Sequence, residues 1–431
     1  GTLLPHALGF TGPVTAEQWP DVQAQGLPMD SILGQSGLEK AYDSLLRGQD
    51  GRLLVNAGLD GAVRQTHQLT DAQPGATLVL ALDAGLQTTL QQALKTQIET
   101  LQATAAAGAG REVCAGAAVV VDVKTGGILA AANWPGYDLN TYRTQYSALA
   151  ADAAAPLLDR VFQGLYAPGS AFKPAVAAAA LTAGYDPNAT VNCTGRYLYY
   201  SGYQPRCLQD RHSGPVDLRT ALQYSCNIFF YDTGRRLGVD VFSAMAQQLG
   251  LASPTGVEVP EAEGRLTWSS DSNYQSGLTL MAAIGQGNTA VTPAQLAVYA
   301  ATLATGGPRP TLHFASHALD PATGQTVWQY TPQFTAVPGG ESVFGPIRDG
   351  MVRMAQSTRV LRESPVPCAA KTGSPQRAEQ MPGGGYYTNS VLIGYAPADD
   401  PQIAVSVVLE YGGGGANAAP ILRAVLDACF G

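Results

Sequence analysis

The sequence predicts an α+β fold in which a mainly antiparallel sheet is covered by terminal helices and carries an all-helical insertion, next to a small N-terminal module. Strand-like runs occur near residues 117–131 and again at 390–409, and the chain from about 150 to 310 has helical character. Because the strands lie far apart in sequence, both ends of the chain must contribute to one sheet. We expect a site where the insertion meets that sheet.

The length of the chain sets its domain organisation. At roughly 150 residues per domain, 431 residues favour two or three domains. Residues 1–75 are rich in Gly, Gln and Asp with short apolar runs, which indicates a small helix-plus-strand module. Residues 76–431 are then expected to form one large domain.

Apolar spacing predicts the first elements of the large domain. Leucine and isoleucine recur at three- and four-residue intervals from Leu86 to Leu101, which defines one face of a helix of about twenty residues. The β-rich runs 117–122 and 128–131 predict a hairpin, with the Lys-Thr-Gly-Gly sequence at 124–127 as its turn.

Later elements follow from caps and apolar runs. Thr292 can cap a helix that has Pro293 in its first turn. The runs 390–395 and 403–409 predict two more strands, and 419–430 predicts a closing helix.

The composition excludes several classes of protein. Charged residues make up 13% of the chain, the net charge is −8, and no cluster of five or more Lys and Arg occurs. Nucleic acid is therefore not expected as a partner. No run of eighteen apolar residues is present, and because the chain starts at Gly1 without Met, we expect a signal or anchor in front of it.

The cysteines and histidines do not predict a metal site. The six cysteines show no C-x-x-C spacing, and His313 and His317 lie in a strand-and-loop segment, so neither zinc nor another metal is expected. Cys193 and Cys207 flank a Tyr- and Gly-rich stretch, 194–206, that indicates an exposed hairpin. A disulfide between them and a pair of thiols are both open.

The segment 166–174, Tyr-Ala-Pro-Gly-Ser-Ala-Phe-Lys-Pro, carries the first candidate catalytic residues. Pro174 is tolerated only if a helix starts close to Ser170, and Ser170 and Lys173 then share one face of the first turn. A serine hydroxyl needs an adjacent base, which a lysine with a lowered pKa can supply. The pattern also arises by chance, so it needs support from other motifs.

A second motif, Ser225-Cys226-Asn227, interrupts a helical run that begins near Leu218. We expect Ser225 and Asn227 in a short turn between two helices, with their side chains on one side. The hydroxyl can relay a proton, and the carboxamide can hold a substrate amide. An ordinary helix cap explains the same residues.

A third motif, Lys371-Thr372-Gly373-Ser374, follows an apolar approach to a predicted strand. Gly373 lets a substrate backbone lie close to the strand edge, while Lys371 and Thr372 offer a charge and a hydrogen bond to a carboxylate. The same three letters at 124–126 are interpreted as turn chemistry.

The order Ser-x-x-Lys, Ser-x-Asn, Lys-Thr-Gly is the signature of β-lactamases and penicillin-binding proteins. The chain resembles a class B penicillin-binding protein, a monofunctional peptidoglycan D,D-transpeptidase, over nearly its whole length. Departures are mild, since Ala370 stands where the family usually has Gly and Ser374 replaces the commoner Thr. Similar family sequences occur at Gly37-Leu38-Glu39, Leu82-Asp83, Asp159-Arg160, Ile284-Gly285-Gln286-Gly287 and Gly394-Tyr395-Ala396-Pro397.

The resemblance implies the penicillin-binding transpeptidase fold and a catalytic role for three residues. Ser170 would attack the carbonyl between the two terminal D-alanines of a stem peptide, with loss of one D-alanine. Lys173 would be the base and Ser225 the proton relay. An amine from a neighbouring stem would then resolve the acyl-enzyme, and β-lactams would acylate the same serine.

The resemblance also implies the residues that bind substrate. Asn227 would anchor the substrate amide, and Lys371 and Thr372 would hold the terminal carboxylate beside Gly373. The backbone N–H groups of Ser170 and Ser374 would form the oxyanion hole. No metal or cofactor is implied.

The family context implies a location and partners. Such domains lie on the extracytoplasmic face of the bacterial membrane, held by an N-terminal helix that this chain lacks. Residues 1–75 would then be a truncated spacer that docks other cell-wall synthesis proteins.

Two alternatives remain open at this point. A β-lactamase or D,D-carboxypeptidase on the same fold would use water as the acceptor, but Glu258, Glu261 and Glu263 fall in a Pro-containing loop that indicates a solvated turn rather than a deacylating base. A non-catalytic penicillin sensor would keep the same motif side chains.

Overall fold

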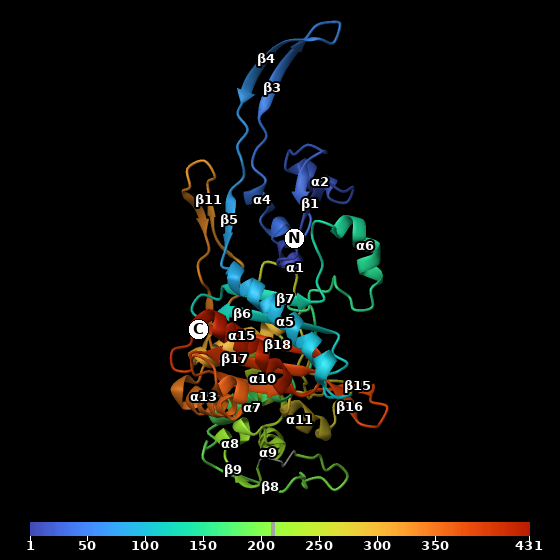
Figure 1. Ribbon diagram of the computed structural model, residues 1–431. Coiled ribbons are helices and arrows are strands. Elements are labelled where there is room, and N and C mark those ends of the chain that lie inside the picture. The colour runs from blue at the N-terminus through green and yellow to red at the C-terminus, as the bar shows by residue number, and fades with distance from the viewer. Residues whose placement is uncertain (208–211) are drawn as a thin grey trace. The chain divides into compact units, whose positions relative to one another are not determined.

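The computed structural model describes residues 1–207 and 212–431 and divides into two compact units (Figure 1). The larger unit comprises Gly1–Leu4, Leu82–His313 and Pro332–Gly431, and the smaller comprises Pro5–Ala81 and Phe314–Thr331. The segment Phe314–Thr331 was expected in the large domain. It joins the smaller unit because β11 (Ala315–Leu319) pairs with both β5 (Thr77–Leu80) and β12 (Thr326–Gln329).

The smaller unit combines short helices with β-hairpins. Strands β3 (Arg52–Ala57) and β4 (Val63–Thr70) pair antiparallel as a long hairpin, and every residue of both strands is exposed. The remaining elements of this unit are α1 (Pro5–Leu8), β1 (Thr11–Pro13), α2 (Trp19–Ala24), β2 (Ile32–Gly34), α3 (Gly37–Ala41) and α4 (Asp43–Leu46). The predicted helix-plus-strand character of the N-terminal residues is present.

The larger unit is built on a five-stranded antiparallel sheet. Its strands lie in the order β14, β17, β18, β6, β7, so the third motif lies on an edge strand. The strands are β14 (Ala369–Gly373), β17 (Ser390–Ala396), β18 (Ile403–Glu410), β6 (Ala115–Asp122) and β7 (Ile128–Trp134). Between β7 and β14 the chain leaves this sheet, which confirms the predicted assembly from distant segments.

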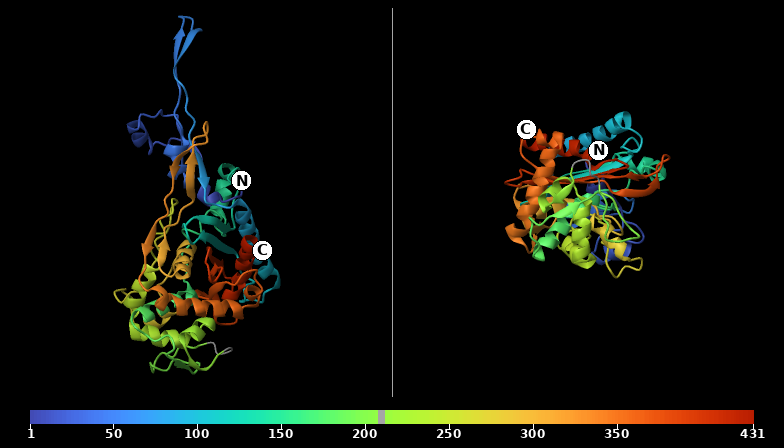
Figure 2. Two further views of the ribbon diagram at one scale, coloured as in Figure 1. Left: turned by 90° about the vertical axis from the view of Figure 1, so that its left-hand side faces the viewer. Right: turned by 90° about the horizontal axis from the view of Figure 1, so that it is seen from below.

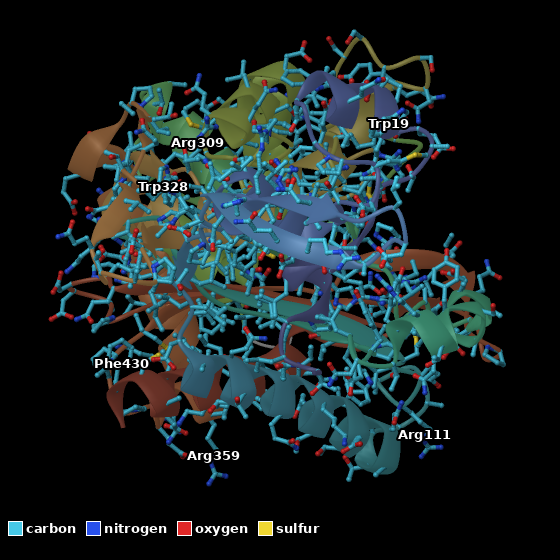
Figure 3. All side chains as sticks on the ribbon, turned by 90° about the horizontal axis from the view of Figure 1, so that it is seen from above. Trp19, Arg111, Arg309, Trp328, Arg359 and Phe430 are labelled. Carbon is cyan, nitrogen blue, oxygen red and sulfur yellow. The ribbon has the colours of Figure 1, made fainter. Side chains whose placement is uncertain are left out.

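Helices α5 (Ala84–Thr104) and α15 (Ala419–Phe430) cover one face of this sheet, as predicted. The predicted apolar stripe of α5, from Leu86 to Leu101, is buried in one cluster with sheet residues. Figure 3 shows α5 beside the end of α15 that Phe430 marks. The hairpin of β6 and β7 also forms as expected, and Gly126 in its turn has φ +81°.

Helix α12 (Pro293–Thr305) packs on the opposite face of the sheet. Along β18, Val405 and Val407 join the α5 cluster, whereas Ser406 between them donates a hydrogen bond to the Pro293 carbonyl at 2.6 Å. This alternation is the ordinary consequence of strand geometry. The predicted Thr292 cap is present as a reciprocal capping box with Gln295.

The helical insertion lies beyond this face, and the right-hand view of Figure 2 shows the sheet between the two helical layers. Its helices are η1 (Gly169–Phe172), α7 (Lys173–Thr182), α8 (Leu218–Gln223), α9 (Asn227–Leu237), α10 (Val239–Gln248) and α11 (Ser276–Ala283), with α13 (Gly340–Ser357) and α14 (Arg359–Arg362) following later in the chain. The other elements of the larger unit are α6 (Tyr142–Ala151), β8 (Val191–Cys193), β9 (Gly214–Val216), β10 (Pro308–Pro310), β13 (Phe334–Ala336), β15 (Gln376–Gln380), β16 (Tyr386–Thr388) and η2 (Gly415–Ala418).

None of the helices within residues 1–207 and 212–431 combines the length and the apolar character that a membrane crossing requires.

Candidate active site

Ser170 lies on the short 3-10 turn η1, and α7 begins three residues later at Lys173 with Pro174 in its first turn. The prediction that a helix starts close to Ser170 is therefore accurate to one turn. Gly169 has φ +56°, a conformation that favours glycine, and its N–H donates to the Gly285 carbonyl at 2.9 Å. This bond fixes the backbone that presents the serine.

The second motif forms the predicted turn between two helices. Helix α8 ends at Gln223 and α9 starts at Asn227. Ser225 has φ +58°, which is uncommon for a residue with a side chain. Cys226 caps α9, because its Sγ accepts a hydrogen bond from the Phe229 N–H. This turn directs the side chains of Ser225 and Asn227 toward Lys173.

The third motif occupies the edge strand β14 and reaches the Ser170 turn. A Cβ on Gly373 would overlap the Pro168 carbonyl oxygen and lie 3.2 Å from the Ser170 amide nitrogen. A side chain at this position is therefore excluded. Ser374 follows directly, exposed, and its Oγ accepts a hydrogen bond from the Gly415 N–H at 2.8 Å. The strand thus brings Lys371, Thr372 and Ser374 beside the candidate nucleophile.

Lys173 is fully buried and holds the second motif. Its Nζ donates to the Ser225 carbonyl at 2.7 Å, to Ser225 Oγ at 3.1 Å and to Asn227 Oδ1 at 2.7 Å. Burial lowers the pKa of Lys173 to about 7, against a smaller opposing effect from Cys226 and Cys207. Desolvation disfavours the charged amine, so a large neutral population exists near neutral pH. A neutral amine is the form that can accept a proton from a serine.

Lys371 is buried as well and contacts the Ser225 hydroxyl. Its Nζ lies 3.1 Å from Ser225 Oγ and donates to the Thr372 carbonyl at 2.9 Å. Burial, and then the charge of Lys173, lower the pKa of Lys371 well below its usual range. We expected Lys371 to serve a substrate carboxylate. Its contact with Ser225 Oγ also provides a second path for proton transfer, since the proton of this hydroxyl can pass to Lys173 or to Lys371.

A group that the sequence analysis did not anticipate lies directly behind this turn. Cys193, Cys207, His212 and Cys226 place their ligand atoms within 4.8 Å of one another, a set that could hold a metal ion. All six cysteines of the chain carry thiols in this structure, so Cys193 and Cys207 are not joined. Three sulfurs and one imidazole suit tetrahedral Zn²⁺.

Local contacts tie this cysteine cluster to the catalytic motif. His212 Nε2 lies 3.5 Å from the Sγ atoms of Cys193 and Cys207. The Asn227 backbone N–H donates to Cys207 Sγ at 3.2 Å. The hydrogen bond that Cys207 shares with Cys226 lowers the pKa of Cys207 to about 4, with help from backbone donors and against burial, which raises it; the same pairing raises the pKa of Cys226. The sequence did not indicate the cluster, because its four members are irregularly spaced along the chain and come from β8, two loops and a helix cap.

A buried ion pair supports the segment that leads to the nucleophile. Arg160 Nε donates to Glu410 Oε1 at 2.8 Å, and the same oxygen accepts the Tyr166 hydroxyl at 2.8 Å. The guanidinium also donates to the carbonyls of Ala154 and Ala155. Tyr166 therefore stays in place four residues before Ser170. The Asp159-Arg160 sequence was noted for the resemblance, but this positioning role was not predicted.

The sheet with its helical insertion and the three converging motifs define an acyl-serine enzyme of the penicillin-binding class. The family model described as "Penicillin binding protein transpeptidase domain" matches residues 116–427, and the "Penicillin-binding Protein dimerisation domain" matches residues 1–80. The chain belongs to the penicillin-binding protein transpeptidase family.

Its relatives specify the branch of the family. The chain is 30% identical over 455 residues to the peptidoglycan D,D-transpeptidase MrdA of Acinetobacter baumannii, covering 99% of this chain and 65% of that protein. It thus spans about two thirds of that relative. The predicted membership of the penicillin-binding protein transpeptidase family is confirmed.

Two solved structures confirm the fold. One, titled "Structural coordination of polymerization and crosslinking by a peptidoglycan synthase complex", aligns with a TM-score of 0.87 at 32% identity over 98% of this chain and 74% of that one. The other, penicillin-binding protein A from M. tuberculosis as an imipenem acyl-enzyme, aligns with a TM-score of 0.72 at 27% identity over 84% and 81%.

Proposed function

We propose that this chain crosslinks peptidoglycan stem peptides through an acyl-enzyme on Ser170. The observation that carries the proposal is the buried Lys173: burial lowers its pKa to about 7, which leaves a neutral amine population one turn away from the serine, and hydrogen bonds to Ser225 and Asn227 hold its position. The family membership supplies the reaction class, and the geometry of the motifs supports the proposed role of each residue.

Acylation starts when Ser170 Oγ attacks the carbonyl between the two terminal D-alanines. The serine proton goes to the neutral amine of Lys173, and Ser225 passes a proton to the departing D-alanine nitrogen. The backbone N–H groups of Ser170 and Ser374 stabilise the oxyanion that forms on the carbonyl oxygen. The amine of a second stem then attacks the ester, Ser170 leaves with a proton, and a new amide bond joins the stems.

The donor stem peptide lies along the free edge of β14. Asn227 offers one Nδ2 hydrogen to the substrate amide, because the other donates to the Arg206 carbonyl and Oδ1 already accepts from Lys173. Lys371 and Thr372 hold the terminal carboxylate, and the absence of a side chain at Gly373 lets the peptide approach the strand. A β-lactam follows the same path, because its ring amide replaces the D-alanyl-D-alanine bond.

Penicillin labelling tests the site assignment. We expect a fluorescent penicillin to add one covalent adduct, and peptide mapping to place it on Ser170. Ser170→Ala should remove the adduct without changing the melting temperature, whereas Ser147→Ala on the exposed face of α6 should keep it. An adduct that persists in Ser170→Ala overturns the assignment.

A second measurement separates the transpeptidase from a hydrolase. Glu261, one of the acidic residues near the insertion, accepts hydrogen bonds from the Thr255 and Gly256 N–H groups and so closes a loop. It is not available as a deacylating base. We expect a long-lived adduct and slow turnover of a chromogenic cephalosporin, and rapid turnover contradicts the proposal.

The smaller unit is proposed to dock other cell-wall synthesis proteins. Its β3–β4 hairpin exposes apolar side chains, which marks a surface for a partner. The exposed residues are Leu53, Leu54, Val55, Leu59, Val63 and Leu69. The relative solved within a peptidoglycan synthase complex favours a glycan-polymerising partner. Replacing Leu54 and Leu59 by Asp should weaken binding to such a polymerase in a pull-down and leave penicillin labelling unchanged.

The location of the substrate indicates the cellular compartment in which the enzyme works. Stem peptides are crosslinked in the wall, so we propose that the catalytic unit works on the extracytoplasmic face of the bacterial membrane. Protease treatment of intact spheroplasts should digest the protein, and protection there would contradict this location.

A further inference from the structure

The cysteine cluster holds two thiols at a distance from which they can react with each other. Cys207 Sγ and Cys226 Sγ lie 4.0 Å apart. Cys207 keeps 8% of its surface exposed, whereas Cys226 has none. A small oxidant therefore reaches Cys207 first, and Cys226 lies within reach to resolve the oxidised sulfur.

The same two residues frame the catalytic turn. Cys226 stands between Ser225 and Asn227, and its Sγ caps α9. Cys207 Sγ accepts the Asn227 N–H at 3.2 Å, and the carbonyl of Arg206 beside it accepts from Asn227 Nδ2 at 3.3 Å. Any change at these sulfurs is transmitted to Asn227, and from there to Lys173 Nζ, which donates to Asn227 Oδ1 at 2.7 Å.

We propose that Cys207 and Cys226 form an oxidative modification site, and that a disulfide between them switches off acylation of Ser170. The inference rests on the proposed function, because the lost activity is the acylation step. The oxidant belongs to the class of peroxides, of which hydrogen peroxide is the simplest member.

The chemistry balances as a two-electron oxidation. The Cys207 sulfur attacks one peroxide oxygen, the O–O bond breaks, and a sulfenic acid and one water form. The Cys226 sulfur then attacks the Cys207 sulfur, the S–O bond breaks, and the hydroxyl leaves with the thiol proton as a second water. The two sulfurs together supply the two electrons that reduce the peroxide.

The disulfide is not compatible with the present turn. An S–S bond is about 2 Å long, so the two sulfurs must approach by roughly half of their separation. That movement withdraws the acceptor of the Asn227 N–H and shifts Cys226, the residue directly after Ser225. A displacement of about 1 Å in a catalytic group can cost on the order of 100-fold in rate. A metal ion held by the four ligands would protect the thiols, because it would occupy the sulfur lone pairs that attack the oxidant.

The test compares thiol state and acylation on the full chain. The protein is treated with a few equivalents of hydrogen peroxide in a buffer with a chelator, and the rate of fluorescent penicillin labelling is measured before and after dithiothreitol. We expect a crosslinked peptide that joins Cys207 to Cys226, labelling slowed about 100-fold, and full recovery on reduction. Labelling of the untreated protein reports the proposed function, so failure there is distinct from failure of the switch.

Conservative variants keep the contacts while removing the reaction. Cys226→Ser retains an oxygen to cap α9, and Cys207→Ser retains an acceptor for the Asn227 N–H. Each variant is compared with its own labelling rate before oxidation, and both should keep that rate after it, whereas Cys114→Ser should lose activity on oxidation as the parent does. A crosslink between Cys193 and Cys207 instead, a crosslink without loss of labelling, or a peroxide-sensitive Cys226→Ser overturns the proposal.

Discussion

Lys173 on α7 and Lys371 on β14 both contact the Ser225 hydroxyl, and each Nζ lies 3.1 Å from Ser225 Oγ. One lysine starts a helix of the insertion and the other lies on the edge strand of the sheet. Both are buried, and the charge of Lys173 contributes to the lowered pKa of Lys371. Two adjacent ammonium groups repel each other, so the pair favours a state with one proton fewer. Ser225 is therefore the natural bridge for that proton.

The pH dependence of the acylation rate should follow the protonation of the Lys173 amine. Its pKa lies near 7, below its usual value, so the neutral base disappears as the pH falls through 7. The penicillin acylation rate should drop about tenfold per pH unit below 7 and level off above it. Stopped-flow labelling between pH 5 and 9 measures the profile. Lys173→Arg, which stays charged, should not be labelled at any pH, and a flat profile for the parent would exclude Lys173 as the base.

Loss of the Ser225 hydroxyl should slow acylation by about 10² to 10⁴, because the proton relay between the lysines is removed. Both Ser225→Ala and Ser225→Gly remove the hydroxyl, but only glycine also relieves the backbone strain, so comparing the two separates the effect on catalysis from the effect of strain. The backbone at this position has φ +58°, which glycine adopts without cost, so Ser225→Gly should melt no lower than the parent. Fast acylation in Ser225→Gly would show that the hydroxyl is dispensable.

Gly373→Ala should damage both the fold and the site. The added methyl group overlaps the Pro168 carbonyl and crowds the Ser170 amide, so we expect a loss of about 1–3 kcal/mol in the free energy of unfolding. Denaturant titration measures the stability, and penicillin labelling should slow at the same time. Gly383→Ala is the matched control, since nothing lies within 4 Å of its Cβ position. Equal stability for the two variants would contradict the close approach of β14 to the serine turn.

Metal addition and removal should change stability through the cysteine cluster. Zn²⁺ held by the folded ligand set would stabilise the fold, so we expect a higher melting temperature with stoichiometric Zn²⁺ and a lower one after chelation. Calorimetry and metal analysis measure the shift and the stoichiometry. In Cys193→Ser the shift should shrink, whereas Cys429→Ser, on the far end of α15, should behave as the parent. An unchanged melting temperature in the parent would show that no ion binds.

The sequence predicted those features that depend on local spacing. The apolar period of α5 predicted its buried face, the Thr292 cap predicted the start of α12, and the order of the three motifs predicted the enzyme class. Each of these rests on residues that are close together in the chain. Periodicity and caps act over a few residues, which makes them readable without coordinates.

Contacts between distant segments could not be predicted in this way. The return of β11 to β5 moved Phe314–Thr331 into the smaller unit, and no local signal in that segment indicates its strand partner. The position of Lys371 on Ser225, 146 residues away in sequence, depends on the placement of the edge strand against the insertion.

By itself, the sequence determined the class of enzyme and the helices and strands that carry the candidate nucleophile. Only the tertiary structure decided that two buried lysines share one hydroxyl and that three thiols and an imidazole gather behind it. The physical reason is that burial and the resulting pKa shifts are properties of the packed interior. Packing brings together side chains whose separation along the chain has no period and no motif.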